Sequence, residues 1–244
     1  MSLPIISELK AIKSKREISY IKRAQKISEE VLHETLTNLK TGITEIKLAN
    51  LIINCFKQRK VRALAFEPIV AFAISTADIH HEPKNTKLKL GDTVIFDLGC
   101  TINSYCSDMT RTFFFGKPTA KQQRVYLAVL EAQQRALQKL SQGERRTKII
   151  DKAARHFLTK KYANKSFTHG LGHGIGTTIH EWPNFKLASK DILKSNMVVT
   201  VEPGLYLKNW GGVRIEDMVV ITKKGIKNLT TFPKDLKSIT LQPK

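Results

Sequence analysis

Four acidic residues in this sequence lie at corresponding places beside apolar segments that are typical of buried strands. Asp97 and Asp108 belong to one such region, and Glu202 and Glu216 belong to another about a hundred residues later. Carboxylates that converge within an apolar sheet repel one another, so their pKa values rise and some take protons unless cations hold them. Hard divalent ions are the natural counter-charge, because carboxylate oxygens bind them well. The pattern predicts a metal site.

We expect the first pair of acids on a β-hairpin. A strand from Thr93 reaches Asp97, a second strand spans Tyr105–Phe115, and the polar pair Asn103-Ser104 suits the turn between them. Asp97 and Asp108 are nearly equidistant from this turn. We therefore expect them to face each other across the ladder, with Cβ atoms about 5 Å apart.

The second pair of acids has the same setting. Expected strands at Val198–Leu207 and Val213–Thr222 flank the turn residues Lys208–Gly212, which places Glu202 near Glu216. Two ions about 3.5–4 Å apart can share bridging carboxylates and together activate a water. For any single acid, a surface salt bridge to one of the abundant lysines is the simpler explanation. Four acids at matched positions favour the metal site.

A glycine-rich segment, His169–Gly176, supplies a candidate nitrogen ligand, His173. Its glycines let backbone approach a metal centre closely, although loop flexibility alone also accounts for them. His180 follows shortly afterwards and adds a second imidazole to the region. The five predicted metal ligands are Asp97, Asp108, His173, Glu202 and Glu216.

The elements that position these residues occur twice, at about 14–115 and 118–222. A capping box at Ser14 and Glu17 opens the first helix. The expected elements are helices at 14–40 and 44–59 and a strand at 66–74, followed in the second half by helices at 118–143 and 147–161. His80-His81-Glu82-Pro83 is matched 100 positions later by His180-Glu181-Trp182-Pro183. We infer one α+β domain, residues 1–244, with strands meeting at a pseudo-twofold axis and helices outside.

Composition narrows the class of protein. The chain has 244 residues, 41% of them hydrophobic, and no apolar run reaches the ~18 residues of a membrane helix. The N-terminal region carries charges and no apolar signal segment, which predicts a cytoplasmic protein. The three cysteines, Cys55, Cys100 and Cys106, are expected as buried thiols. The net charge of +20 comes from scattered lysines, which favours a solvated surface over a nucleic-acid partner.

Five segments in order resemble the pita-bread metallopeptidases, which include methionine aminopeptidases, Xaa-Pro aminopeptidases and prolidases. The resemblance covers nearly the whole chain from around Ile12. The segments that carry it are Ile95–Gly99, Ser107–Thr112, Gly172–Gly176, Val201–Gly204 and Arg214–Asp217. The resemblance implies a pita-bread fold with a curved, mainly antiparallel sheet.

The Xaa-Pro branch is the most similar part of this family, on the segments Ile179–Pro183, Glu202–Tyr206 and Gly211–Asp217. The sequence departs from the pattern before the first catalytic histidine, where Ile79 replaces the usual proline. His80 fits that histidine better than its neighbour His81, because His80 matches His180 across the repeat. Full-length Xaa-Pro enzymes commonly have an N-terminal accessory domain, and we expect none here.

The resemblance implies roles for the metal ligands. Asp97 would chelate one ion, Asp108 and Glu216 would bridge both ions, and His173 and Glu202 would complete the second. The oxygen-rich donor set favours Mn²⁺, with Co²⁺, Fe²⁺ and Zn²⁺ as alternatives.

It also implies roles in catalysis and substrate binding for four further residues and for Glu202. His80 and His180 would hydrogen-bond the substrate and the developing oxyanion, and Glu202 would carry the proton from water to the leaving nitrogen. His169 would contact the substrate backbone or brace its loop. Arg214 would bind a substrate carboxylate or form an ion pair with neighbouring acids.

The expected function is a dinuclear-metal exopeptidase that hydrolyses the N-terminal Xaa-Pro bond of peptides. Its partners would be peptides with proline at the second position and, in a homodimer, a second copy of the chain. A prolidase, a methionine aminopeptidase and a non-enzymatic binding module on the same fold remain as alternatives.

Overall fold

The first long helix begins at its predicted capping residues, and the second begins at a capping box that the sequence analysis did not predict. In the computed structural model, which describes residues 5–162 and 166–242, α2 (Lys15–Thr37) starts after a capping box of Ser14 and Glu17. α4 (Ala120–Ser141) starts after the same device, built from Thr119 and Gln122. α3 (Glu45–Gln58) and α5 (Thr147–Lys161) complete the two helix pairs. The four helix predictions are confirmed to within a few residues at each end.

Two short elements differ from expectation. A helix α1 (Ile5–Ala11) precedes α2, where no element is predicted. The strand expected at 66–74 is shorter, because β1 (Ile69–Phe72) gives way to a 3₁₀ helix, η1 (Ala73–Ala77). Ala73 has a φ of 48°, which ends the extended backbone at that residue.

The strands of the two halves form two larger sheets and two ribbons. One sheet has the order β1, β2, β5, β13, and the other has the order β12, β11, β8, β6, β7. β1, β2 and β5 of the first half thus correspond to β6, β8 and β11 of the second. The bounds are β2 Thr93–Leu98, β5 Met109–Phe115, β6 Gly172–Gly174, β7 Glu181–Phe185, β8 Val198–Val201, β11 Asp217–Ile221, β12 Ile226–Asn228 and β13 Thr240–Leu241. The ribbons are β3 (Thr101–Ile102) with β4 (Tyr105–Cys106), and β9 (Gly204–Leu207) with β10 (Gly211–Arg214).

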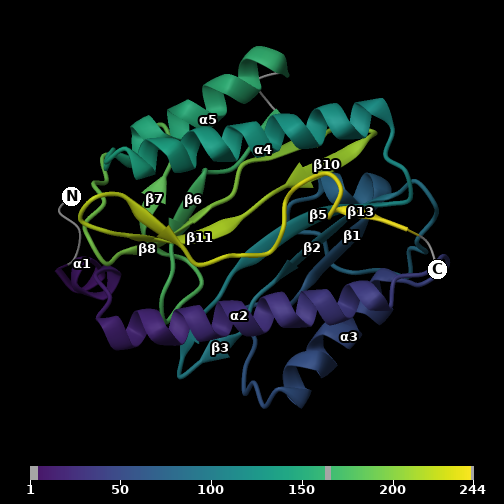
Figure 1. The fold of residues 1–244 in the computed structure, drawn as a ribbon, viewed down its shortest axis with the longest axis horizontal. Helices are drawn as coiled ribbons and strands as arrows, with labels where there is room; N and C mark the ends of the chain where they lie inside the picture. Colours follow the sequence, from purple (N-terminus) through teal and green to yellow (C-terminus); the bar gives the residue numbers. More distant parts are fainter. Residues whose placement is uncertain (1–4, 163–165, 243–244) are drawn as a thin grey trace.

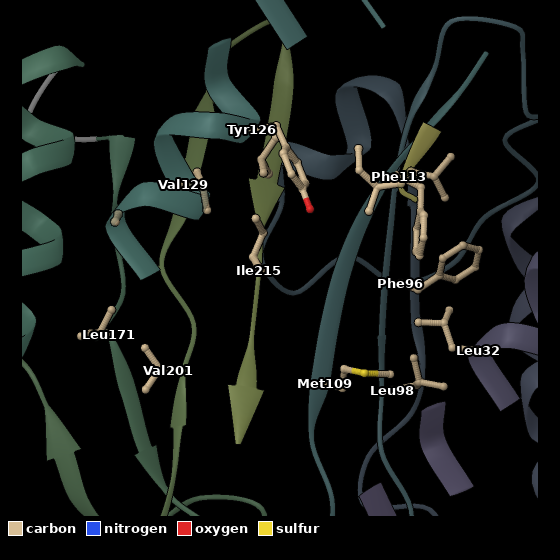
Figure 2. Packing of buried hydrophobic residues seen from close by; sticks show 14 of the residues in the cluster. Leu32, Phe96, Leu98, Met109, Phe113, Tyr126, Val129, Leu171, Val201 and Ile215 are labelled. Atoms are coloured by element: carbon tan, nitrogen blue, oxygen red, sulfur yellow. The ribbon is translucent and has the colours of Figure 1, made fainter. Parts of the chain in front are cut away.

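The helices lie outside the strands. Figure 1 shows α2 and α3 along one side of the molecule and α4 and α5 along the opposite side, with the strands between them. Buried apolar side chains of both halves fill the space between the layers, among them Leu32, Phe96, Val129 and Leu171 (Figure 2). Full burial of one such side chain stabilises the fold by roughly 1.5–3 kcal/mol. No helix in the described ranges is long and apolar enough to cross a membrane.

The predicted register of the first hairpin is wrong by two residues. The turn is where expected, with Asn103 and Ser104 at φ 49° and 69°, the geometry of a tight hairpin turn. Asp97, however, pairs with Thr110, and Asp108 lies just before β5. The chain leaves the ladder between β4 and β5, so the expected strand 105–115 is interrupted. Asp97 and Asp108 are therefore diagonal neighbours on one face.

The second hairpin is interrupted in the same way, at its acids. β8 ends before Glu202 and β11 begins after Glu216, although both were expected inside long strands. The Glu202 N–H donates to Leu171 O at 2.8 Å, and the Glu216 N–H donates to Thr110 O at 3.1 Å. This last bond joins the two halves, so the breaks in the strands bring the acids of both halves to one place.

Candidate metal centre

One cavity between the halves of the fold receives every residue that the sequence predicts for the site. Its volume is about 540 Å³. The predicted residues that line it are His80, Asp97, Asp108, His169, His173, His180, Glu202, Arg214 and Glu216. Ligand atoms of three of them, Asp108, His173 and Glu216, lie within 4.8 Å of one another, and all three side chains are buried. Tertiary folding thus gathers residues that are up to 136 positions apart in the chain.

His173 is oriented as a ligand from β6. Its Nδ1 lies 3.0 Å from Gly174 O, and a carbonyl can only accept, so this nitrogen carries the hydrogen. Nε2 is left with its lone pair, 3.3 Å from Glu202 Oε1 and 3.6 Å from Asp108 Oδ2. Burial lowers the pKa of His173 to about 4, which keeps the ring neutral. A neutral imidazole with one nitrogen fixed by a carbonyl is the usual form of a metal-ligating histidine.

Burial, and after it repulsion between neighbouring charges, raises the pKa values of three carboxylates in the cavity. Burial raises the pKa of Asp108 well above its ordinary range, and the charges of Glu216 and Asp97 add to this effect. Burial followed by Glu202 and Asp97 does the same to Glu216. The pKa of Glu202 rises to about 8, again chiefly through burial. The repulsion expected from the sequence is therefore present, and divalent cations would relieve it.

Asp97 offers one free oxygen to the centre. Its Oδ2 accepts from Arg214 Nη2 at 2.6 Å, whereas its buried Oδ1 has no hydrogen-bond partner within residues 5–162 and 166–242. A buried carboxylate oxygen without a donor is costly unless a cation approaches it. The donor set of carboxylates and one neutral imidazole fits divalent metal ions.

The family model of metallopeptidase family M24 matches residues 19–223. The chain belongs to this family. Solved structures agree: the X-Pro aminopeptidase from Thermotoga maritima superposes with a TM-score of 0.92 and 35% identity, over 98% of this chain and 66% of that one. The Xaa-Pro dipeptidase from Bacillus anthracis has a TM-score of 0.92 and 34% identity, over 98% of this chain and 67% of that one. The predicted fold class is confirmed.

A curated relative is an uncharacterized peptidase of Staphylococcus aureus. It is 38% identical over 229 residues, which are 94% of this chain and 65% of that protein. The M24 chain described here thus spans about two thirds of the length of the curated relatives that it matches.

The two adjacent histidines of the first half have different surroundings in the M24 fold. His81 is buried, and its Nε2 donates to Glu45 Oε2 at 2.9 Å. His80 is exposed and lines the cavity. On the other side, the exposed His180 stacks edgewise on His173 with ring centroids 4.4 Å apart. One exposed histidine from each half thus lines the cavity that contains the predicted ligands.

His169 and Arg214 are already engaged by protein groups. Burial lowers the pKa of His169 to about 3; Nδ1 of the neutral ring donates to Gly170 O, and Nε2 accepts from the Tyr206 hydroxyl at 2.8 Å. All three guanidinium nitrogens of Arg214 donate, to Thr110, Tyr206 and Asp97. Of the two roles expected for each residue, these contacts favour bracing the site over binding substrate directly.

Sequence reasoning missed Thr110 and Tyr206 as parts of the site. The Thr110 hydroxyl donates to Glu216 Oε2 at 2.8 Å and accepts from Arg214 Nε. The Tyr206 hydroxyl connects Arg214 with His169. Thr110 lies two residues after Asp108 and so on the same face of the strand, a period-2 signal that could have identified it. Nothing local to Tyr206 indicates its partners.

Proposed function

We propose that this chain is the catalytic part of a dinuclear-metal exopeptidase that hydrolyses the N-terminal Xaa-Pro bond of peptides. The observation that carries the proposal is the convergence of four carboxylates and one neutral imidazole, drawn from both halves, in a cavity that also has a histidine on each side. The similarity to an X-Pro aminopeptidase and an Xaa-Pro dipeptidase supports the substrate class.

The five candidate ligands would hold two divalent ions, of which Mn²⁺ suits the oxygen-rich set. When bound, these ions supply positive charge that lowers the pKa of water and polarises the scissile carbonyl. The residues that would hold them are Asp97, Asp108, His173, Glu202 and Glu216, the carboxylates and the neutral imidazole that line the cavity.

Proton transfer falls to Glu202. Burial raises its pKa to about 8 in the metal-free protein, and bound cations would lower that pKa again. The ionised carboxylate lines the cavity beside His173, where it can accept a proton from water and later give it up. Glu202 would take the proton of the attacking water and deliver it to the leaving prolyl nitrogen.

His80 and His180 would bind the substrate carbonyl from opposite sides of the cavity. Such preorganised donors are typically worth about 3–4 kcal/mol each when charge develops on the oxygen. A prolyl nitrogen has no hydrogen, so recognition has to come from the shape of the cavity. Ile79 and Phe185 offer apolar wall for the ring, and Lys186 adds a cation that is exposed at the rim.

We place the aminopeptidase before the dipeptidase because all three guanidinium nitrogens of Arg214 already donate to protein groups, Thr110, Tyr206 and Asp97. A dipeptidase needs a group for the nearby substrate carboxylate, and Arg214 was the sequence candidate for it. Prolidase activity remains the second candidate on the similarity to the Bacillus anthracis Xaa-Pro dipeptidase.

The test is a peptide panel with Mn²⁺ and metal quantification of the purified protein. We expect release of the first residue from Ala-Pro-Ala, slower cleavage of Ala-Pro, and negligible cleavage of Met-Ala-Ser. Faster cleavage of Ala-Pro would move the assignment to prolidase. Rapid methionine release would make the chain a methionine aminopeptidase. Salt-sensitive nucleic-acid binding without any cleavage would favour the non-enzymatic alternative.

A further inference from the structure

A buried lysine lies outside the predicted site, where α1 meets α2. Only 1% of the Lys13 side chain is exposed, and its Nζ lies 2.9 Å from Glu181 Oε2. Burial lowers the pKa of Lys13, and the Glu181 carboxylate opposes this effect. The Lys13 backbone N–H donates to Asn196 O at 3.0 Å, which fixes the start of the side chain. Burying this ion pair costs desolvation free energy. The contacts of its acidic partner, Glu181, indicate what the pair does.

Glu181 binds the backbone of the segment 176–181, which includes the cavity residues Ile179 and His180. Glu181 Oε1 accepts from the N–H groups of Thr177 and Thr178 at 2.8 and 3.2 Å. Gly176 lies so close that a Cβ there would be 2.5 Å from both carboxylate oxygens. The segment 176–181 is thus wrapped around one carboxylate, with Lys13 on its other oxygen.

The same loop carries His180, the residue before Glu181. The His180 ring touches His173 edgewise, with centroids 4.4 Å apart and planes at 77°. Its nitrogens donate to no other residue in the part of the chain that the structure describes. The position of the ring therefore depends on its contact with His173 and on the loop backbone, of which the Thr177 and Thr178 N–H groups donate to the Glu181 carboxylate.

We infer that Lys13 is a positioning residue: through Glu181 it fixes the loop that aims His180 into the cavity. This inference rests on the proposed function, because it concerns a histidine of the same site. Lys13 touches neither the candidate ligands nor the open part of the cavity. Its effect would reach the reaction only through His180.

The test is a double-mutant cycle on Lys13→Met and His180→Ala with an Xaa-Pro tripeptide and Mn²⁺. Misplacement of a catalytic group by about 1 Å lowers rates by up to ~10²-fold, so Lys13→Met should lower kcat roughly 10- to 100-fold with KM and bound metal close to the parent values. Lys13→Arg should recover much of the rate. In the His180→Ala background, Lys13→Met should have little further effect. An equal loss in both backgrounds would overturn the inference.

A matched control is available on the same side of the molecule. Lys194 forms an ion pair with Glu8 of α1, but that pair is exposed, at 52% and 41% of the two side chains. Lys194→Met should leave kcat within about twofold, because exposed pairs contribute little. If Lys13→Met does not fold, Glu181→Gln replaces it in the same cycle, since it keeps an oxygen acceptor and removes the charge.

A readout without turnover separates this inference from the proposed function. The ring signal of His180 in ¹H–¹³C NMR spectra, assigned by its loss in His180→Ala, should shift in Lys13→Met and not in Lys194→Met. An unmoved signal would contradict the positioning role whether or not the protein cleaves peptides. A shifted signal in a protein that cleaves no Xaa-Pro peptide would sustain the positioning of the ring while the proposed function fails.

Discussion

The two halves of the molecule hold their cavity histidines by related but unequal means. In the first half, Glu45 accepts from the N–H groups of Phe72 and Lys84 and from the ring of His81, the neighbour of His80. In the second half, Glu181 accepts from two backbone N–H groups and a side-chain cation, and is itself the neighbour of His180. Each histidine thus lies beside a residue of a carboxylate hydrogen-bond network, with three donors for Glu45 and four for Glu181 once the Thr177 hydroxyl is included.

The anchors differ in where the carboxylate stands in the sequence. Glu45 is the first residue of α3 and lies 36 positions from His81, whereas Glu181 lies 168 positions from Lys13. Both halves therefore use a carboxylate to hold the backbone beside the cavity histidine, but the carboxylates do not occupy corresponding positions of the repeat. Different side chains can hold a backbone segment in place, provided that every buried donor has an acceptor.

The halves also brace each other. Arg214 of the second half holds Asp97 of the first, and Thr110 of the first half holds Glu216 of the second. Each carboxylate therefore takes its orientation from the opposite half, and we expect the site to behave as one unit.

The largest effect should come from removing a candidate ligand of the metal centre that lies between the two halves. Asp108→Ala should abolish metal binding and activity together, a loss greater than the roughly 10²–10³-fold that a single hydrogen-bond donor supplies. Metal quantification and turnover with Mn²⁺ measure both. Glu131→Ala is the control, because the partly exposed Glu131 lies on α4 and pairs with Arg135, outside the cavity. Full metal content in Asp108→Ala would show that the halves do not share a centre.

An intermediate effect is expected from the first-half anchor. Glu45→Gln keeps one oxygen but faces three donors, so at least one buried N–H loses its acceptor, at a cost of about 1–3 kcal/mol. We expect a lower unfolding temperature and a kcat reduced about tenfold through displacement of His80. Thermal unfolding and Xaa-Pro kinetics check this. A destabilised variant with unchanged kcat would limit Glu45 to stability and break the parallel with Lys13.

The smallest effect is the pH dependence of stability in the metal-free protein, which comes from the buried acids of both halves. In metal-free protein, Asp108, Glu202 and Glu216 have raised pKa values, chiefly through burial, so the folded state keeps protons that the unfolded chain has released. Stability should therefore fall as pH rises from 6.5 to 8, by up to about 1.4 kcal/mol per pH unit for one retained proton shared among the coupled acids. His169 and His173, with depressed pKa values, lose their contribution only as pH falls below about 6.5.

Thermal unfolding in EDTA across this range measures the effect. For a chain of this size, 1 kcal/mol corresponds to roughly 2–4 °C. We expect a fall of several degrees in EDTA and a much smaller one with Mn²⁺, because bound cations favour the ionised acids. A flat profile in EDTA would mean that the acids of the two halves do not share protons.

Local features of the sequence predicted the helices and turns. The capping boxes at Ser14 and Thr119 are complete within four residues of chain, and the Asn103-Ser104 turn depends only on its own backbone. The site residues were found because their motifs, such as Gly172–Gly176, lie within short segments that resemble a known family. All nine of them line one cavity.

The sequence by itself therefore determined the helix ends, the doubled order of elements and the residue types that a metal centre needs. Tertiary structure alone decided that Oδ2 of Asp97 accepts from Arg214 and that Asp108 lies outside the ladder. It also decided that Lys13 pairs with Glu181, in the loop of His180. The physical reason is range: capping and periodicity act within a few residues, whereas strand register and buried ion pairs depend on chain segments a hundred or more residues apart.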